Sequence, residues 1–243
     1  MSKAVLITGG SRGIGRATVL AAARRGWSVA INYVRDGEAA EATASEARAL
    51  GVLAVALQAD VSVEAEVLAL FDASEAALGP LSGVVINSGI VAPSSRLADM
   101  SFDRLKRMFD VNVMGALLCA REGARRLKAG GSMVIVSSVA ARLGSPDEYV
   151  DYAASKGALD TLTIGLSKEL GPQGVRVNAV RPGLIETDIH ASGGRPDRAQ
   201  VLGAGVPLRR PGRAEEVAEA IAWLLGDESS YVTGSLMDIS GGR

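Results

Sequence analysis

The chain of 243 residues has few of the side chains that disulfides and metal sites require. It contains one cysteine, Cys119, and one histidine, His190. A single cysteine excludes an intramolecular disulfide, and a Cys/His cluster able to hold zinc or iron is excluded as well. We therefore predict no metal site and expect Cys119 to be a thiol of the core or of an interface.

A strong net charge and long apolar runs are also missing. The 26 basic and 27 acidic residues give a formal net charge of −1, which provides no electrostatic basis for binding nucleic acid or an anionic membrane. No apolar run approaches the ~18 residues of a membrane span, and the start of the chain lacks the organisation of a signal peptide. We expect a cytoplasmic protein whose partners include neither nucleic acid nor membrane.

Short apolar runs alternate with helical stretches from one end of the chain to the other. The runs at 84–87 and 133–137 are almost continuously apolar, which is typical of parallel strands covered on both faces. The alternation predicts an α/β fold, a doubly wound parallel sheet of the Rossmann type with three layers, in a single domain over residues 1–243. One long helix is expected from Ser101 to about residue 128.

One stretch, residues 184–211, has no regular pattern and contains several glycines and prolines. A connection of this length in a compact domain is usually a functional lid or a disordered segment. We interpret it as a lid over the substrate, with His190 as one of its residues.

A glycine-rich turn at residues 8–15 follows the first predicted strand. Glycines let the backbone approach a pyrophosphate, and the helix that follows offers free N–H groups and the positive end of its dipole. The turn therefore predicts a dinucleotide site made by Gly9, Ser11, Arg12, Gly13, Ile14 and Gly15.

Two other motifs compete for the same residues. Residues 9–13 also match G-x-S-x-G, in which Ser11 would be the nucleophile of an esterase and His190 its base. That reading leaves nothing upstream of the first strand to supply an oxyanion loop. A Walker A motif is excluded because no Gly-Lys-Ser/Thr follows.

The end of the second strand indicates which dinucleotide is bound. NAD enzymes place an acidic residue there for the ribose 2′-hydroxyl, but here no acid appears before Asp36, which we interpret as the start of the next helix. Arg12 and Arg35 would instead bind a 2′-phosphate. We therefore expect NADP(H) rather than NAD(H), with Tyr33 as a further contact.

Tyr152 and Lys156 lie four residues apart and share one face of a predicted helix. A phenol with a pKa of about 10 is a poor acid–base catalyst at neutral pH, and a nearby ammonium lowers that pKa. Ser138 follows a buried strand, at the sheet edge where ligands bind in such folds. Asn112 interrupts an apolar helix, where an unpaired amide would be costly.

Taken together, these motifs resemble the short-chain dehydrogenase/reductase family, including members similar to 3-oxoacyl-carrier-protein reductases and glucose-1-dehydrogenases. The resemblance covers essentially the whole chain. The matching residues are 8–15, Asp60, Val61, 87–89, Asn112, Ser138, 152–156, 181–183 and Thr187.

The resemblance implies an oxidoreductase that transfers a hydride between NADP(H) and a small carbonyl or secondary alcohol substrate. Tyr152 would be the general acid or base, Ser138 would orient the substrate oxygen, and Lys156 would lower the tyrosine pKa and hold the nicotinamide ribose. Asn112 would hold a water of a proton relay. Further cofactor contacts would come from Asp60, Val61, Asn87, Gly89, Pro182, Gly183, Ile185 and Thr187.

The resemblance also implies a homotetramer. The stretch 111–120 has one polar side chain, and the helix at 152–166 is poor in charge, so both would leave apolar surface uncovered on a single sheet. We expect these two helices to form part of the subunit interface.

Some positions depart from the family pattern. Ile86 replaces a usual asparagine, and the interval from Ser138 to Tyr152 is one residue longer than the commonest one, with the insertion at 144–149. Ser137 and Tyr149 are neighbours that could be mistaken for the catalytic pair. An alternative function is a redox-sensing module that binds NADP(H) without turnover, which would need only the phosphate loop.

Overall fold

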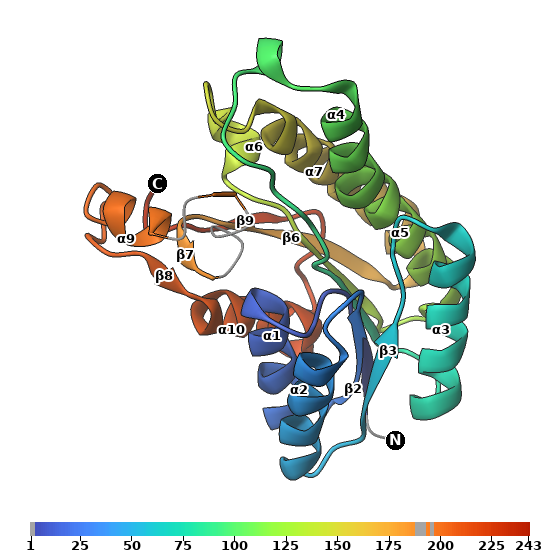
Figure 1. Cartoon of the computed structure of the whole chain (residues 1–243). Helices are drawn as coiled ribbons and strands as arrows, with labels where there is room; N and C mark the ends of the chain where they lie inside the picture. The colour runs from blue at the N-terminus through green and yellow to red at the C-terminus, as the bar shows by residue number, and fades with distance from the viewer. Residues whose placement is uncertain (1–2, 188–192, 195–196) are drawn as a thin grey trace.

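The structure is a computed structural model that describes residues 3–187, 193–194 and 197–243 (Figure 1). A seven-stranded sheet has the order β3-β2-β1-β4-β5-β6-β9, and its neighbouring strands are parallel. These strands are β1 (Ala4–Ile7), β2 (Ser28–Tyr33), β3 (Ala54–Gln58), β4 (Gly83–Ile86), β5 (Ser132–Val136), β6 (Arg176–Pro182) and β9 (Leu236–Ile239).

Helices cover both faces of this sheet (Figure 1). Val5 and Ile7 of β1 pack into one apolar cluster, whereas Leu6 packs into the other, because successive side chains of a strand point to opposite faces. This arrangement confirms the predicted three-layer, doubly wound fold. The first face is covered by α1 (Gly13–Arg24), α2 (Gly37–Ala49) and α10 (Ala214–Leu225), the second by α3 (Glu64–Leu78), α5 (Gly115–Arg126) and α7 (Val150–Leu170).

The strand order reverses between β1 and β4. Strand β1 pairs with β2 on one side and with β4 on the other, so the connections that follow β1 and β4 diverge at this point. Ligands of open α/β sheets bind in the crevice that such a reversal leaves at the carboxyl ends of the strands. We therefore expect the ligand site at the segments that follow β1, β4, β5 and β6.

The long helix expected from Ser101 to about residue 128 is interrupted. Ser101 does cap its start, accepting a hydrogen bond from the Arg104 amide at 3.3 Å. The helix α4 (Phe102–Phe109) then widens into a π-helical turn, η2 (Asp110–Met114), before α5 begins. Such π turns are frequent at functional sites, and this one contains Asn112.

The segment 184–211 is more regular than the sequence predicted. It contains the strand β7 (Ile185–Glu186), which pairs in parallel with β8 (Gly212–Arg213), and the helix α9 (Arg198–Gly203). His190 lies outside the described residues, and the role of the segment as a lid stays a prediction. The remaining short helical elements are η1 (Leu97–Asp99), α6 (Ala140–Leu143), η3 (Gly171–Gln173) and η4 (Asp227–Ser229).

Cys119 lies in the core between the sheet and the helices of the second face. Burial raises the pKa of its thiol to about 12, so the sulfur is protonated at neutral pH and is not a nucleophile. Within the described ranges, no group of three or more metal-ligating side chains could hold an ion. None of the helices described is long and apolar enough to cross a bilayer.

Candidate active site

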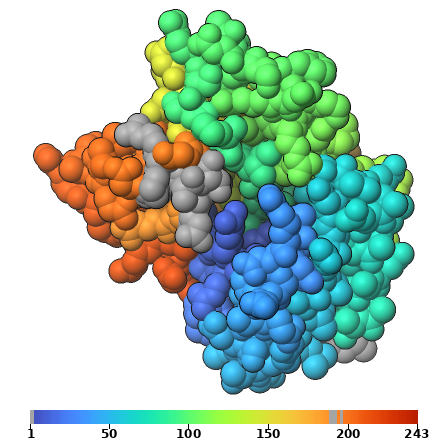
Figure 2. Space-filling model, in the orientation of Figure 1, coloured from blue at the N-terminus to red at the C-terminus, as the bar shows by residue number. Residues whose placement is uncertain are grey.

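A pocket of about 170 Å³ opens at the carboxyl edge of the sheet, where the strand order reverses. Segments from the N-terminal part of the chain, from near residue 100 and from the C-terminal region meet on this face (Figure 2). Predicted site residues that line the pocket are Ile14, Asn87, Gly89, Ser138, Tyr152, Lys156, Pro182, Gly183, Ile185 and Thr187.

The turn after β1 has room for backbone only. Gly9 and Gly13 have φ values of +64° and +53°, which glycine adopts without strain. A Cβ at Gly15 would lie 2.1 Å from the Gly9 carbonyl oxygen. The three glycines therefore keep the backbone open at the start of α1, as a bound pyrophosphate requires.

Hydrogen bonds connect the residues that follow β4 to this turn. The Asn87 side-chain amide donates to the carbonyls of Thr8 and Gly9 at 2.9 and 3.1 Å. In return, the Thr8 hydroxyl accepts from the backbone amides of Asn87 and Ser88 at 2.9 and 3.0 Å. Asn87 thus fixes the loop through its side chain, while the buried Ile86 packs in the apolar core.

One of the two predicted arginines lies in the turn, and the other follows the strand beside it. Arg12 is the residue before α1, and Arg35 follows β2, the strand next to β1. Both side chains are exposed, and within the described part of the chain neither guanidinium has a hydrogen-bond or ion-pair partner. Asp36 caps α2 by accepting from the Ala39 amide at 3.0 Å, as interpreted from the sequence. Both guanidinium groups are therefore available for an added anion.

Other predicted contacts of the dinucleotide lie at the same edge. Tyr33 lies against Gly37, with its hydroxyl oxygen 3.3 Å from the position of a Cβ there. The Asp60 carboxylate accepts from the Ser62 amide and hydroxyl at 2.9 and 2.6 Å. Burial acts to raise the pKa of Asp60, but the hydrogen bonds from Ser62 and the charge of Arg107 keep it below its ordinary value. The Asp60 carboxylate is therefore hydrogen-bonded to Ser62, two residues along the chain, and Val61 between them is buried.

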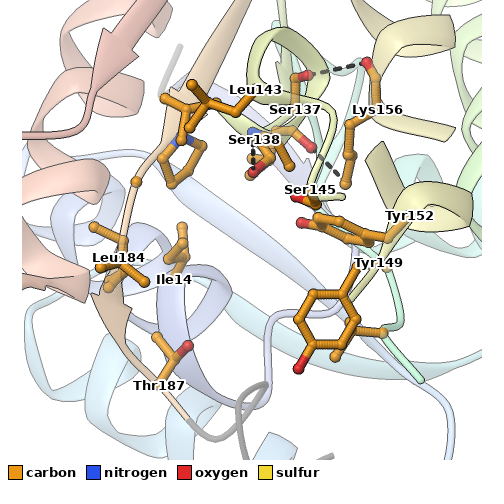
Figure 3. Close-up of a pocket in the computed structure, with 18 of the residues that line it drawn as sticks. Ile14, Ser137, Ser138, Leu143, Ser145, Tyr149, Tyr152, Lys156, Leu184 and Thr187 are labelled. Carbon is orange, nitrogen blue, oxygen red and sulfur yellow. Dashed lines mark hydrogen bonds between the residues drawn. The ribbon is translucent and has the colours of Figure 1, made fainter. Parts of the chain in front are cut away.

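Ser138, Tyr152 and Lys156 meet in the pocket (Figure 3). The Ser138 hydroxyl accepts from the Ala140 amide at 3.1 Å, which leaves its own proton free to donate. Lys156 donates from Nζ to the Val136 carbonyl at 2.9 Å and lies 5.6 Å from the centre of the Tyr152 ring.

The surroundings of these groups change their proton affinities. Burial raises the pKa of Tyr152, and a hydrogen bond with Ser138 acts against that shift. Burial lowers the pKa of Lys156 to about 8, although the charge of Asp160 acts in the opposite direction. In each case burial disfavours the charged form, so the buried site by itself favours the neutral phenol and the neutral amine.

Asn112 is fully buried and connects three segments. Its side-chain oxygen accepts from the Ile90 amide at 2.8 Å, and its amide donates to the Ile90 carbonyl at 3.0 Å and to Ser155 at 3.1 Å. A Cβ at Gly89 would lie 3.4 Å from both Asn112 Oδ1 and Lys156 Nζ. The π turn therefore brings Asn112 next to Gly89 and close to Lys156.

The two competing residues point elsewhere. The Ser137 hydroxyl donates to the Lys156 carbonyl at 3.1 Å and is thereby held in the core. Tyr149 lies against the Arg198 guanidinium, 5.0 Å from its ring centre, and its hydroxyl points away from Tyr152 (Figure 3). Ser138 and Tyr152 both line the cavity and are hydrogen-bonded to each other.

The segment after β6 closes the opposite side of the pocket. Gly183 lies so close to β9 that a Cβ would be 2.8 Å from the Ser240 Cα. Thr187 reaches the glycine turn, 3.4 Å from the position of a Cβ at Gly13. Pro182 and Ile185 are buried between them. Leu184 and Thr187 of this segment lie across the cavity from Tyr152 (Figure 3).

Several pocket residues were not identified from the sequence. Arg198 of α9 forms a double hydrogen bond with Glu148 at 2.7 and 2.5 Å, which joins α9 to the inserted loop at 144–149. No local pattern marks this contact, since the two residues are 50 positions apart. Other lining residues without a sequence signal are Val91, Leu143, Ser145, Leu184 and Arg243.

Comparison with known sequences gives consistent matches over the whole chain. A family model described as Enoyl-(Acyl carrier protein) reductase matches residues 9–243. The uncharacterized oxidoreductase YgfF of Escherichia coli (strain K12) is 50% identical over 243 residues, 98% of either chain. The NADPH-dependent aldehyde reductase-like protein, chloroplastic, of Arabidopsis thaliana is 35% identical over 99% of this chain and 93% of its own.

Solved structures share the fold as well. A dehydrogenase/reductase from Sinorhizobium meliloti 1021 has a TM-score of 0.93 and 33% identity, over 100% of this chain and 95% of its own. A short chain dehydrogenase from Burkholderia cenocepacia J2315, solved in complex with NADP, has a TM-score of 0.92 and 36% identity, over 99% and 97% of the two chains.

Proposed function

Because the chain belongs to the short-chain dehydrogenase/reductase family and is an oxidoreductase, we propose that it transfers a hydride between NADP(H) and a small carbonyl or secondary alcohol substrate. Tyr152 is the general acid in reduction and the general base in oxidation. The observation that supports this most is the meeting of Ser138, Tyr152, Lys156 and Asn112 beside the glycine turn.

The glycine turn and the segment after β6 hold the dinucleotide in this proposal. The space kept free at Gly9, Gly13 and Gly15 fits a pyrophosphate at the N-terminus of α1. Arg12 and Arg35 bind the 2′-phosphate, which favours NADP(H) over NAD(H). The NADP complex of the Burkholderia relative and the name of the Arabidopsis relative point the same way.

Tyr152 exchanges the proton with the substrate. In reduction its phenol donates to the carbonyl oxygen, and in oxidation its phenolate accepts the proton of the alcohol. When bound, the nicotinamide supplies or accepts the hydride. Ser138 donates a hydrogen bond to the substrate oxygen, since its own acceptor site is used by the Ala140 amide.

Lys156 makes this proton transfer possible near neutral pH. Lowering a phenol pKa from about 10 to about 7 requires roughly 4 kcal/mol, and burial of Tyr152 acts against it. The Lys156 ammonium, close to the ring, stabilises the phenolate. Lys156 also holds the nicotinamide ribose, and Asn112 positions a water that connects Lys156 to solvent.

The chain acts as a cytoplasmic homotetramer in this proposal, with residues 184–211 as the lid over the substrate. Met114, Leu117 and Ile164 are 51%, 40% and 41% exposed on neighbouring helices. Apolar side chains gathered on helices in this way are typical of a subunit interface. Covering this face with a second copy would bury them.

The test combines binding and turnover. The purified chain should bind NADPH and reduce members of a carbonyl panel, and Tyr152→Phe should lose about a thousandfold or more in kcat with an unchanged dissociation constant for NADPH. Binding without turnover on carbonyls or alcohols would favour the redox-sensing module. Failure to bind either dinucleotide would remove the proposal and return attention to Ser11.

A further inference from the structure

A buried carboxylate, Asp160, lies one turn beyond Lys156 on α7. The two residues are four positions apart, so they share a face of the helix. Asp160 is 8% exposed. Arg181 of β6 donates from Nε and Nη2 to one of its oxygens, Oδ2, at 3.0 and 2.8 Å. The mechanism above does not use this pair.

Only one of the two carboxylate oxygens of Asp160 is hydrogen-bonded to Arg181. Arginine usually binds a carboxylate through both oxygens, but here Oδ1 of Asp160 is buried and has no hydrogen-bond partner in the described part of the chain. A buried charged oxygen without a partner costs free energy. A neutral or apolar side chain would avoid that cost, so the negative charge itself has a use.

Lys156 provides that use. Its ammonium is buried and donates to the Val136 carbonyl, and no carboxylate of the described residues forms an ion pair with it. Burial lowers the pKa of Lys156 to about 8, and the charge of Asp160 acts to raise it. Asp160 is the counter-charge that this buried ammonium would otherwise lack.

Arg181 gives the carboxylate a second connection. It directly precedes Pro182 and Gly183, which line the pocket. It also lies 3.6 Å from Asp238 of β9, which Arg142 of α6 approaches at 3.3 Å. Charges of alternating sign thus connect α7, β6, β9 and α6, the elements that hold or adjoin the catalytic groups.

We propose that Asp160 is a positioning residue of the active site, whose one carboxylate keeps Lys156 in its ammonium form and, through Arg181, holds the segment at Pro182 against α7. The proposal rests on the proposed function, since the ammonium matters through Tyr152. It assigns Asp160 no contact with the substrate.

The other charges around Lys156 are already balanced. Asp151, beside Tyr152 on α7, pairs with Arg104 of α4 at 2.9 Å, and Asp110 of η2 pairs with Lys106 at 2.6 Å. Glu148 and Arg198 pair with each other at the pocket wall. Asp160 and Arg181, with Asp238 and Arg142 behind them, are therefore the charges whose removal should change the state of Lys156.

The experiment compares Asp160→Asn, Arg181→Gln and the double variant with the parent chain. Carbonyl reduction requires both the phenol proton and the ammonium, so kcat falls as pH rises and the Tyr152–Lys156 pair loses a proton. Removing the negative charge in D160N should move this falling limb down by about one pH unit. Removing the positive charge in R181Q should move it up, and the double variant should lie near the parent.

Shifts of opposite sign distinguish an electrostatic role from a structural one, because loosening α7 from β6 would lower activity in both variants without moving the limb. If kcat falls at the same pH in all chains, or if this pH shifts in the same direction in D160N and R181Q, the proposal is overturned. If D160N does not fold, as judged by thermal unfolding and NADPH binding, the upward shift in R181Q still decides the matter.

A second measurement does not depend on turnover. In chains labelled with 13C at the lysine Cε, the Lys156 resonance is assigned by its loss in Lys156→Arg and titrated by NMR. The pKa of Lys156 should fall in D160N and rise in R181Q. If the parent chain shows no turnover but these shifts appear, the proposed function fails while Asp160 still controls Lys156. If turnover is present and the shifts are absent, the inference fails alone.

Discussion

Replacing Arg12 and Arg35 with alanine should remove the preference for NADPH while leaving NADH binding unchanged. Arg12 lies in the glycine turn and Arg35 follows β2, the strand next to β1; both are exposed, and neither has a protein partner among the residues described. No carboxylate therefore has to be displaced when a 2′-phosphate binds. NADH lacks that phosphate, so it gains nothing from either side chain.

The size of the effect follows from the kind of contact. A hydrogen bond to a charged group contributes about tenfold or more in affinity, and solvent exposure favours the lower end of that range. Each single variant should therefore lower the ratio of NADPH to NADH affinity by about tenfold, and the double variant by about 100-fold. Added salt should reduce the ratio in the parent chain more than in the double variant, since exposed charges are screened.

Fluorescence titration of the four chains with each dinucleotide measures these ratios. Arg25→Ala is the matched control, because this substitution also removes one positive charge. Arg25 lies at the other end of α1, away from the glycine turn, and is paired with Glu219. Its ratio should equal that of the parent. An unchanged ratio in the double variant would refute the assignment of Arg12 and Arg35, and an equal loss of NADH binding would show a general effect on the turn.

Three further predictions test the pocket and the interface. Gly15→Ala should abolish dinucleotide binding in titrations, because the added Cβ would lie 2.1 Å from a carbonyl oxygen of the turn; retained affinity would show that the turn can yield. Arg198→Met should raise KM about tenfold or more with a smaller change in kcat, because Glu148 loses its double hydrogen bond at the pocket that Arg198 lines; a loss confined to kcat would contradict this. Met114→Asp should dissociate the proposed tetramer in light scattering, since it places a charge on an apolar face; an unchanged mass would exclude this surface from the interface.

The local sequence determined most of the framework. Apolar runs bounded by glycines predicted the strands, and the parallel sheet with helices on both faces follows because such runs must be covered on both sides. The position of the glycine turn after β1 and its residues were enough to predict a turn with room for a dinucleotide. Asp36 was correctly interpreted as the start of the next helix, because an acid at the first turn of a helix is a common cap.

Contacts between distant segments could not be predicted in this way. The π turn at Asp110–Met114 depends on how Asn112 meets Ile90 and Ser155, and a helical pattern does not reveal an added residue in one turn. Strand β7, within 184–211, forms because it pairs with β8, which lies beyond that segment in the sequence.

The sequence by itself placed Tyr152 and Lys156 on one helix face, since a spacing of four residues is a local property of the helix. Only the tertiary structure brought Arg181 to Asp160 and Arg198 to Glu148. An ion pair between separate elements depends on how β6, α7 and α9 pack, and packing is a property of the whole chain. The pairing of Tyr152 with Lys156 could thus be predicted locally, whereas the charges around these side chains and the shape of the pocket were decided by the fold.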